Sequence, residues 1–395
     1  MNDIENTTPR SGRRWSRNLA LFLVLVAGHP AWCRDPGAEW VRIGGGPGTG
    51  CASGADYAFF AREGDPHRVM VFFEGGGACW NGLNCDEHGA PTFDARVDDS
   101  DHPSRFDGLF DLGNDANPVA GYFILFVPYC TGDVHLGSRD ANYSRETAIG
   151  APARSHRIRH QGYRNAAAAL GWLLARVRQP ELVLVAGSSA GAIPTPLYAA
   201  WLAQRYPGAR LVQLAEGAGG YRAKTIPALM EQWGARATIE QLGLAPGKAE
   251  PLTFESLYSI AAKAAPAVTF AQFNRVQDDI QARFLRLFGG EPLSLSCALG
   301  ANLADVGAAV PAFRSYSAPG SDHSVLASAS LYSLRVDGVP LRDWVAALVA
   351  GEPVPNVGTD QVEEPCQAAR PDRDGAALDY NGPQSRNVLN PEEFP

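Results

Sequence analysis

The 395-residue sequence lacks the marks of several large classes of protein. Its 34 lysines and arginines are outnumbered by 42 aspartates and glutamates, and the net charge of -8 argues against nucleic acid or an anionic membrane as a partner. No Cys-x-x-Cys pair or His/Cys cluster has the spacing of a zinc site. The glycine run Gly75-Gly-Gly77 is not followed by a nucleotide-binding motif. The sequence therefore implies neither a metal ion nor an organic cofactor.

Long apolar runs are also scarce. The one near the N-terminus, Leu19 to Gly28, follows several arginines and has a small-residue site near its end, at about Val26-Ala-Gly28, which is typical of an export signal. It is short for a membrane span, and no other stretch is long and apolar enough to cross a bilayer. We therefore predict that residues 1–31 are a signal peptide, or alternatively an uncleaved N-terminal anchor, and that the protein is secreted or periplasmic. We expect no other membrane association, and the sequence leaves the oligomeric state open.

The seven cysteines agree with export to an oxidising compartment. Cys79 and Cys85 lie close together in one predicted loop and are the candidate disulfide. The remaining cysteines cannot be paired from the sequence, and the odd total leaves one over.

Short apolar segments alternate with helical patterns along the middle of the chain. A helix is indicated by Leu170, Leu173, Leu174 and Val177, which recur at helical spacing. This alternation predicts a mostly parallel sheet with helices on both faces, spanning residues 38–352. We place a helical insertion at about 221–265 and a Pro-rich tail at 353–395. The predicted strands are Trp40–Ile43, Tyr57–Ala61, Val69–Phe73, Tyr122–Val127, Leu182–Ala186, Leu211–Ala215, Val268–Phe273 and Phe313–Ser317.

The run Gly187-Ser-Ser-Ala-Gly191 matches the G-x-S-x-G turn that leads a buried strand into a helix. A buried strand precedes it, and an Ala-rich helical segment, Pro194 to Arg205, follows it. In such a turn Ser189 would lie at the tip and act as a nucleophile. The alternative is an ordinary Gly/Ser-rich helix start. With this turn the predicted sheet becomes α/β-hydrolase-like.

A serine nucleophile needs a histidine to take its proton and an acid to orient that histidine. His323 is the single histidine after Ser189, the order that G-x-S-x-G hydrolases use, although it could be a plain surface residue. For the acid we favour Asp278, shortly after a predicted strand, with Asp279 and Glu216 as alternatives. Asp278 could instead be a helix N-terminal residue stabilised by the helix dipole.

Backbone donors for an oxyanion can be located in the same way. The glycines of Gly75-Gly-Gly77 follow a buried strand and would let the backbone approach the substrate, and Ala190 follows the proposed nucleophile. The alternative for the glycine run is a plain turn.

These motifs together resemble the pectin acetylesterases and the Notum carboxylesterases. The resemblance covers about Cys51 to Gly351, and its most specific part is Phe73-Glu-Gly-Gly-Gly-Ala-Cys-Trp-Asn-Gly-Leu-Asn-Cys85. Further similar stretches are Pro128-Tyr-Cys-Thr-Gly-Asp-Val134, Gly187-Ser-Ser-Ala-Gly191 and Gly320-Ser-Asp-His323. One departure is Glu216, where the family usually has aspartate.

The resemblance implies roles for individual residues. Ser189 is then the nucleophile and His323 the base, and Gln281, three residues after Asp278, favours that aspartate over Asp279. The implied oxyanion donors are Gly76, Gly77 and Ala190, and Cys79–Cys85 is the implied family disulfide.

The predicted function is a secreted serine carboxylester hydrolase that removes short acyl groups, such as acetyl, from a carbohydrate or similar ester. Asp133, Trp80 and His135 could line its pocket or only pack the loops. One alternative is a lipase or polyester depolymerase on the same scaffold. Another is a secreted binding protein that keeps the fold without turnover.

Overall fold

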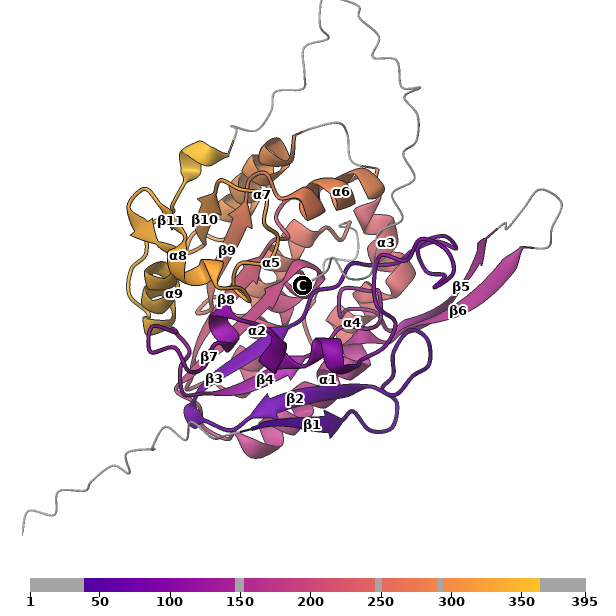
Figure 1. Cartoon of the computed structure of the whole chain (residues 1–395), viewed down its shortest axis with the longest axis horizontal. Helices are drawn as coiled ribbons and strands as arrows, with labels where there is room; N and C mark the ends of the chain where they lie inside the picture. Colours follow the sequence, from indigo (N-terminus) through magenta and orange to yellow (C-terminus); the bar gives the residue numbers. More distant parts are fainter. Residues whose placement is uncertain (1–38, 146–152, 246–250, 290–293, 363–395) are drawn as a thin grey trace, which may run out of the picture. The chain divides into compact units, whose positions relative to one another are not determined.

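The computed structural model describes residues 39–145, 153–245, 251–289 and 294–362. The predicted signal segment and most of the predicted tail lie outside these residues. Within them, the main sheet has eight strands (Figure 1). From one edge to the other they are β1 (Trp40–Gly44), β2 (Ala58–Arg62), β4 (Tyr122–Val127), β3 (Asp65–Phe73), β7 (Leu182–Ser188), β8 (Arg210–Glu216), β9 (Thr269–Arg275) and β10 (Arg314–Ala318).

The sheet is mostly parallel, as predicted. From β4 to β10 every neighbouring pair is parallel, and only β2 runs against its neighbours β1 and β4. The central strands are buried along their apolar runs because both faces of the sheet are covered. The α/β-hydrolase-like fold class is confirmed.

Neighbouring residues of one strand show how the two faces are covered. The ring of Phe73 stacks on Tyr198 of α2 (Thr195–Arg205), whereas Phe72, which points the other way, packs edge-on against Phe110. The α2 face also carries α1 (Gly162–Arg176) and α5 (Phe254–Ala264). The opposite face carries α9 (Leu341–Ala350) and the short helical turns η1 (Asp99–Asp101), η2 (Pro103–Arg105) and η3 (Gly108–Phe110).

The region between β8 and β9 contains helices. They are α3 (Ile226–Trp233), α4 (Ala235–Gln241) and α5, which packs on α2. After β9 come α6 (Asp279–Leu287) and α7 (Leu295–Ala309), and α7 was not predicted. The last elements are α8 (Ser330–Ser333), the strand pair β11 (Arg335–Val336) and β12 (Val339–Pro340), and η5 (Thr359–Gln361).

The segment before α1 contains an antiparallel strand pair that the sequence did not predict, β5 (Arg139–Arg145) and β6 (Arg154–His160). Its alternate residues Tyr143, Ile158 and His160 are buried on one face, and this buried face fixes the register. Because arginines and histidines make up much of both strands, the alternation of apolar and polar residues is not visible in the sequence.

Two disulfides close loops near one end of the sheet. Cys79–Cys85 confirms the predicted pair, and Cys51–Cys130 joins residues that are 79 positions apart. Cys297 is also disulfide-bonded. Among the helices in the described ranges, none is long and apolar enough to cross a membrane.

Candidate active site

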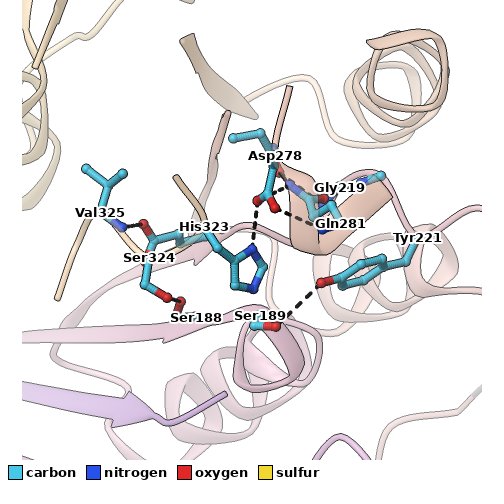
Figure 2. A network of polar contacts seen from close by, with 12 residues as sticks. Ser188, Ser189, Gly219, Tyr221, Asp278, Gln281, His323, Ser324 and Val325 are labelled. Carbon is cyan, nitrogen blue, oxygen red and sulfur yellow. Dashed lines mark hydrogen bonds and ion pairs between the residues drawn. The ribbon is translucent and has the colours of Figure 1, made fainter. Parts of the chain in front are cut away.

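The predicted site residues lie at one edge of the sheet because parallel strands end together there. The glycine run follows β3, Ser189 follows β7, Asp278 follows β9, and His323 lies in the loop after β10. Figure 2 shows Ser189, His323 and Asp278 side by side at this edge. The fold therefore brings together residues that are far apart in the sequence.

Ser189 occupies a strained turn. Its φ of 54° is left-handed, a conformation that residues with a Cβ seldom adopt, and its side chain is almost completely buried. The turn is also closely packed, since a Cβ on Gly191 would lie only 2.2 Å from the Phe73 carbonyl oxygen. This geometry is that of the strand-to-helix elbow that presents a nucleophilic serine.

Asp278 and His323 form a direct contact, with 2.7 Å between Asp278 Oδ2 and His323 Nδ1. The carboxylate is fully buried and also caps α6, because its Oδ1 accepts the Gln281 backbone N–H at 2.8 Å. The two interpretations of Asp278 that the sequence left open, helix cap and histidine partner, are therefore compatible.

The other ring nitrogen of His323 is positioned differently. His323 Nε2 is buried and has no hydrogen-bond partner among the described residues. Figure 2 shows the imidazole directly over Ser189, although no hydrogen bond joins the two side chains. A nitrogen without a partner beside a hydroxyl can accept its proton.

The alternative acids lie elsewhere. Asp279 is exposed at the first position of α6. Glu216 is fully buried but makes no hydrogen bond to His323; its Oε1 accepts the backbone N–H groups of Val325 and Leu326. Burial raises the pKa of Glu216 to about 7. Glu216 thus supports the chain just after the histidine.

The glycine run lies against the serine turn. A Cβ on Gly75 would lie 2.8 Å from Ser189 Cβ, so only glycine permits this approach. The backbone N–H groups of Gly76, Gly77 and Ala190 donate no hydrogen bond to any described residue. Unpaired N–H groups beside a nucleophile can bind a developing oxyanion.

Sequence reasoning missed how the glycine run is supported. His135 Nε2 lies 2.8 Å from the carbonyl oxygen of Glu74, the residue before the run. Burial lowers the pKa of His135 to about 4, so the ring is neutral and donates its Nε2 proton to that carbonyl. His135 also has a left-handed backbone, with φ of 57°. Asp133 is fully buried as well, so neither residue lines an open pocket.

Tyr221 is a second residue that sequence reasoning missed. Its hydroxyl lies 3.4 Å from Ser189 Oγ. Its ring packs against Phe288, which in turn contacts the partly buried Trp80 with ring centroids 4.9 Å apart. Tyr221 belongs to no sequence motif. The sequence feature that could have indicated it is its position shortly after the end of β8, at the same edge of the sheet as Ser189.

The described His, Cys, Asp and Glu side chains do not form a group of three or more that could hold a metal ion. The sheet and the serine turn define an α/β-hydrolase-like protein. The pectinacetylesterase family model matches residues 43–233, which supports the family resemblance seen in the sequence. The match to this family implies a hydrolase that acts on esters. The matched segment includes Ser189 and the glycine run but not Asp278 or His323. No curated protein matches the chain.

Proposed function

We propose that the protein is a secreted serine carboxylester hydrolase that uses Ser189, His323 and Asp278 as a catalytic triad. The observation that carries this proposal is the arrangement of His323, which contacts Asp278 through Nδ1 and faces Ser189 with an unpartnered nitrogen. The strained serine turn and the family match support it independently. The disulfides are typical of an oxidising compartment, which agrees with export.

In this mechanism the Ser189 hydroxyl turns to His323 Nε2, which takes its proton while Oγ attacks the ester carbonyl carbon. The carbonyl oxygen becomes negative and accepts hydrogen bonds from the amides of Gly76, Gly77 and Ala190. The imidazolium then protonates the departing alcohol and leaves an acyl-serine. A water deprotonated by His323 attacks this intermediate, releases the acid and restores the hydroxyl.

The proposed substrate is a small acyl ester, such as an acetyl group, on a carbohydrate. This part comes from the family and not from the geometry of the site. A panel of acetyl, butyryl and long-chain nitrophenyl esters tests it: preference for acetyl supports the proposal, whereas preference for long chains favours a lipase or polyester depolymerase. A protein that hydrolyses none of them would be a binding protein on this scaffold.

The mechanism is tested by labelling with a fluorophosphonate and mapping the modified peptide. Ser189 should carry the label, and Ser189→Ala should abolish both labelling and hydrolysis. Ser188→Ala is a matched control, because Ser188 is the adjacent serine and its Oγ lies 3.3 Å from Ser324 Oγ. Hydrolysis that survives in Ser189→Ala would refute the proposed nucleophile.

A further inference from the structure

Among the described residues, the hydroxyl of Tyr221 has one hydrogen-bond partner, the proposed nucleophile Ser189. Tyr221 Oη lies 3.4 Å from Ser189 Oγ, and neither hydroxyl makes another hydrogen bond to a described residue. Tyr221 is also almost fully buried. A buried phenol without a regular partner is unusual, because burying a hydroxyl costs free energy unless it is hydrogen-bonded.

The position of this phenol is fixed by the network that orients the acid. Gln281 donates through Nε2 to Asp278 Oδ2 at 3.1 Å (Figure 2). Its Oε1 accepts the Gly220 N–H at 2.8 Å. The ring itself packs edge-on against three phenylalanines. They are Phe254, Phe284 and Phe288. Backbone and ring are thus both held, and the hydroxyl points at Ser189.

The contact between Tyr221 Oη and Ser189 Oγ is suited to stabilise a negatively charged transition state more than the resting enzyme. At 3.4 Å it is longer than an ordinary O–H···O hydrogen bond of about 2.8 Å, so it contributes little while Ser189 is neutral. Burial raises the pKa of Tyr221 far above its usual value, so the phenol remains a donor at the pH values at which a histidine works. A hydrogen bond to a negative oxygen is shorter and stronger than one to a neutral oxygen.

We propose that Tyr221 is a further catalytic residue, whose O–H donates a hydrogen bond to the negatively charged oxygen of the tetrahedral intermediate on Ser189. That oxygen and Oγ are bonded to the same carbon, so a phenol beside Oγ is within reach of both. The proton stays on the phenol throughout, and no bond to Tyr221 forms or breaks. The inference rests on the proposed serine mechanism and adds a side-chain donor to the three backbone donors.

The test is Tyr221→Phe, which removes one oxygen and keeps the ring. We expect kcat for nitrophenyl acetate to fall roughly tenfold to a hundredfold with KM unchanged, since the lost interaction is made only in the transition state. The inhibition constant of a boronic acid, which forms a tetrahedral adduct on serine, should rise by a similar factor. The pH values at which the rate profile bends should not move, because His323 and Asp278 are untouched.

Tyr206→Phe is the matched control. Tyr206 is as buried as Tyr221, and its hydroxyl makes one hydrogen bond, to the Val177 carbonyl at 2.9 Å. This variant should keep the parent rate. Parent kinetics in Tyr221→Phe, a loss confined to KM, or a displaced pH profile would each overturn the role of Tyr221. Fluorophosphonate labelling distinguishes an error about Tyr221 from an error about the serine mechanism. If only the role of Tyr221 is wrong, Ser189 is still labelled in the parent protein and in Tyr221→Phe. If the serine mechanism is wrong, Ser189 is not labelled even in the parent protein.

Discussion

Glu216 offers a sharp test of the electrostatics of this site. Its carboxyl group is buried, its Oε1 accepts two backbone N–H groups, and its Oε2 has no partner among the described residues. Glu216→Gln keeps an oxygen for the two N–H groups but removes the ionisable proton. The substitution therefore changes how stability depends on pH while leaving the backbone contacts in place.

The magnitude follows from the pKa of this group. Burial raises the pKa of Glu216 from its ordinary value of 4.5 to about 7, so between these values the native state holds a proton that the unfolded state has released. Rising pH then favours the unfolded state, and stability falls across this window and levels off above pH 7. At about 1.4 kcal/mol per pKa unit, the loss is about 3 kcal/mol.

The assay compares urea unfolding of the parent and Glu216→Gln at pH 4.5 and pH 8. Between pH 4.5 and pH 8 the unfolding free energy of the parent should fall by about 3 kcal/mol relative to that of Glu216→Gln. Other titrating groups are common to both proteins and cancel. Glu181→Gln is the control, because that side chain is 79% exposed and the same change should give no such shift. A difference that is constant with pH would refute the reasoning.

Three further predictions concern the triad and its support. Asp278→Asn should lower kcat by roughly ten thousandfold, and Asp279→Asn should stay near the parent rate; similar losses in both would contradict the assignment of the acid. Ser189→Gly should be more stable than Ser189→Ala by about 1 kcal/mol in urea unfolding, because glycine adopts the left-handed backbone without strain. Equal stability of the two variants would argue against backbone strain at this position. His135→Ala should reduce kcat by roughly a hundredfold, because the glycine run loses its hydrogen bond and is displaced. His135→Gln keeps an N–H donor and should recover part of the lost kcat. An unchanged kcat in His135→Ala would show that His135 does not support the glycine run.

The sheet was predictable because of how parallel strands are buried. Strands such as β4 and β7 are covered on both faces, so they form continuous apolar runs that stand out in a polar sequence. Ser189 and His323 were placed near each other for a related reason. Each follows a strand of the same parallel sheet, and such strands end at one edge.

The support around the site could not be predicted in this way. The bond from His135 to the Glu74 carbonyl and the approach of Tyr221 to Ser189 depend on how separate loops fold back over the sheet. Neither contact has a sequence period or spacing. The β5–β6 hairpin was missed because its alternating pattern is carried by a few buried residues among arginines. The Cys51–Cys130 pair was missed since spacing alone does not pair distant cysteines.

Of the proposed triad, Asp278 was the hardest residue to select from the sequence. A helix cap and a catalytic acid are both indicated in the sequence by an aspartate just before a helix. Here one carboxylate makes both contacts, because Oδ1 caps α6 and Oδ2 contacts His323. The cap serves the second contact, because the N-terminus of a helix favours negative charge next to the imidazole. Gln281 extends this arrangement from Asp278 Oδ2 to the Gly220 backbone, one residue before Tyr221. The first turn of α6 therefore positions Asp278 next to His323 and, through Gln281, the backbone next to Tyr221.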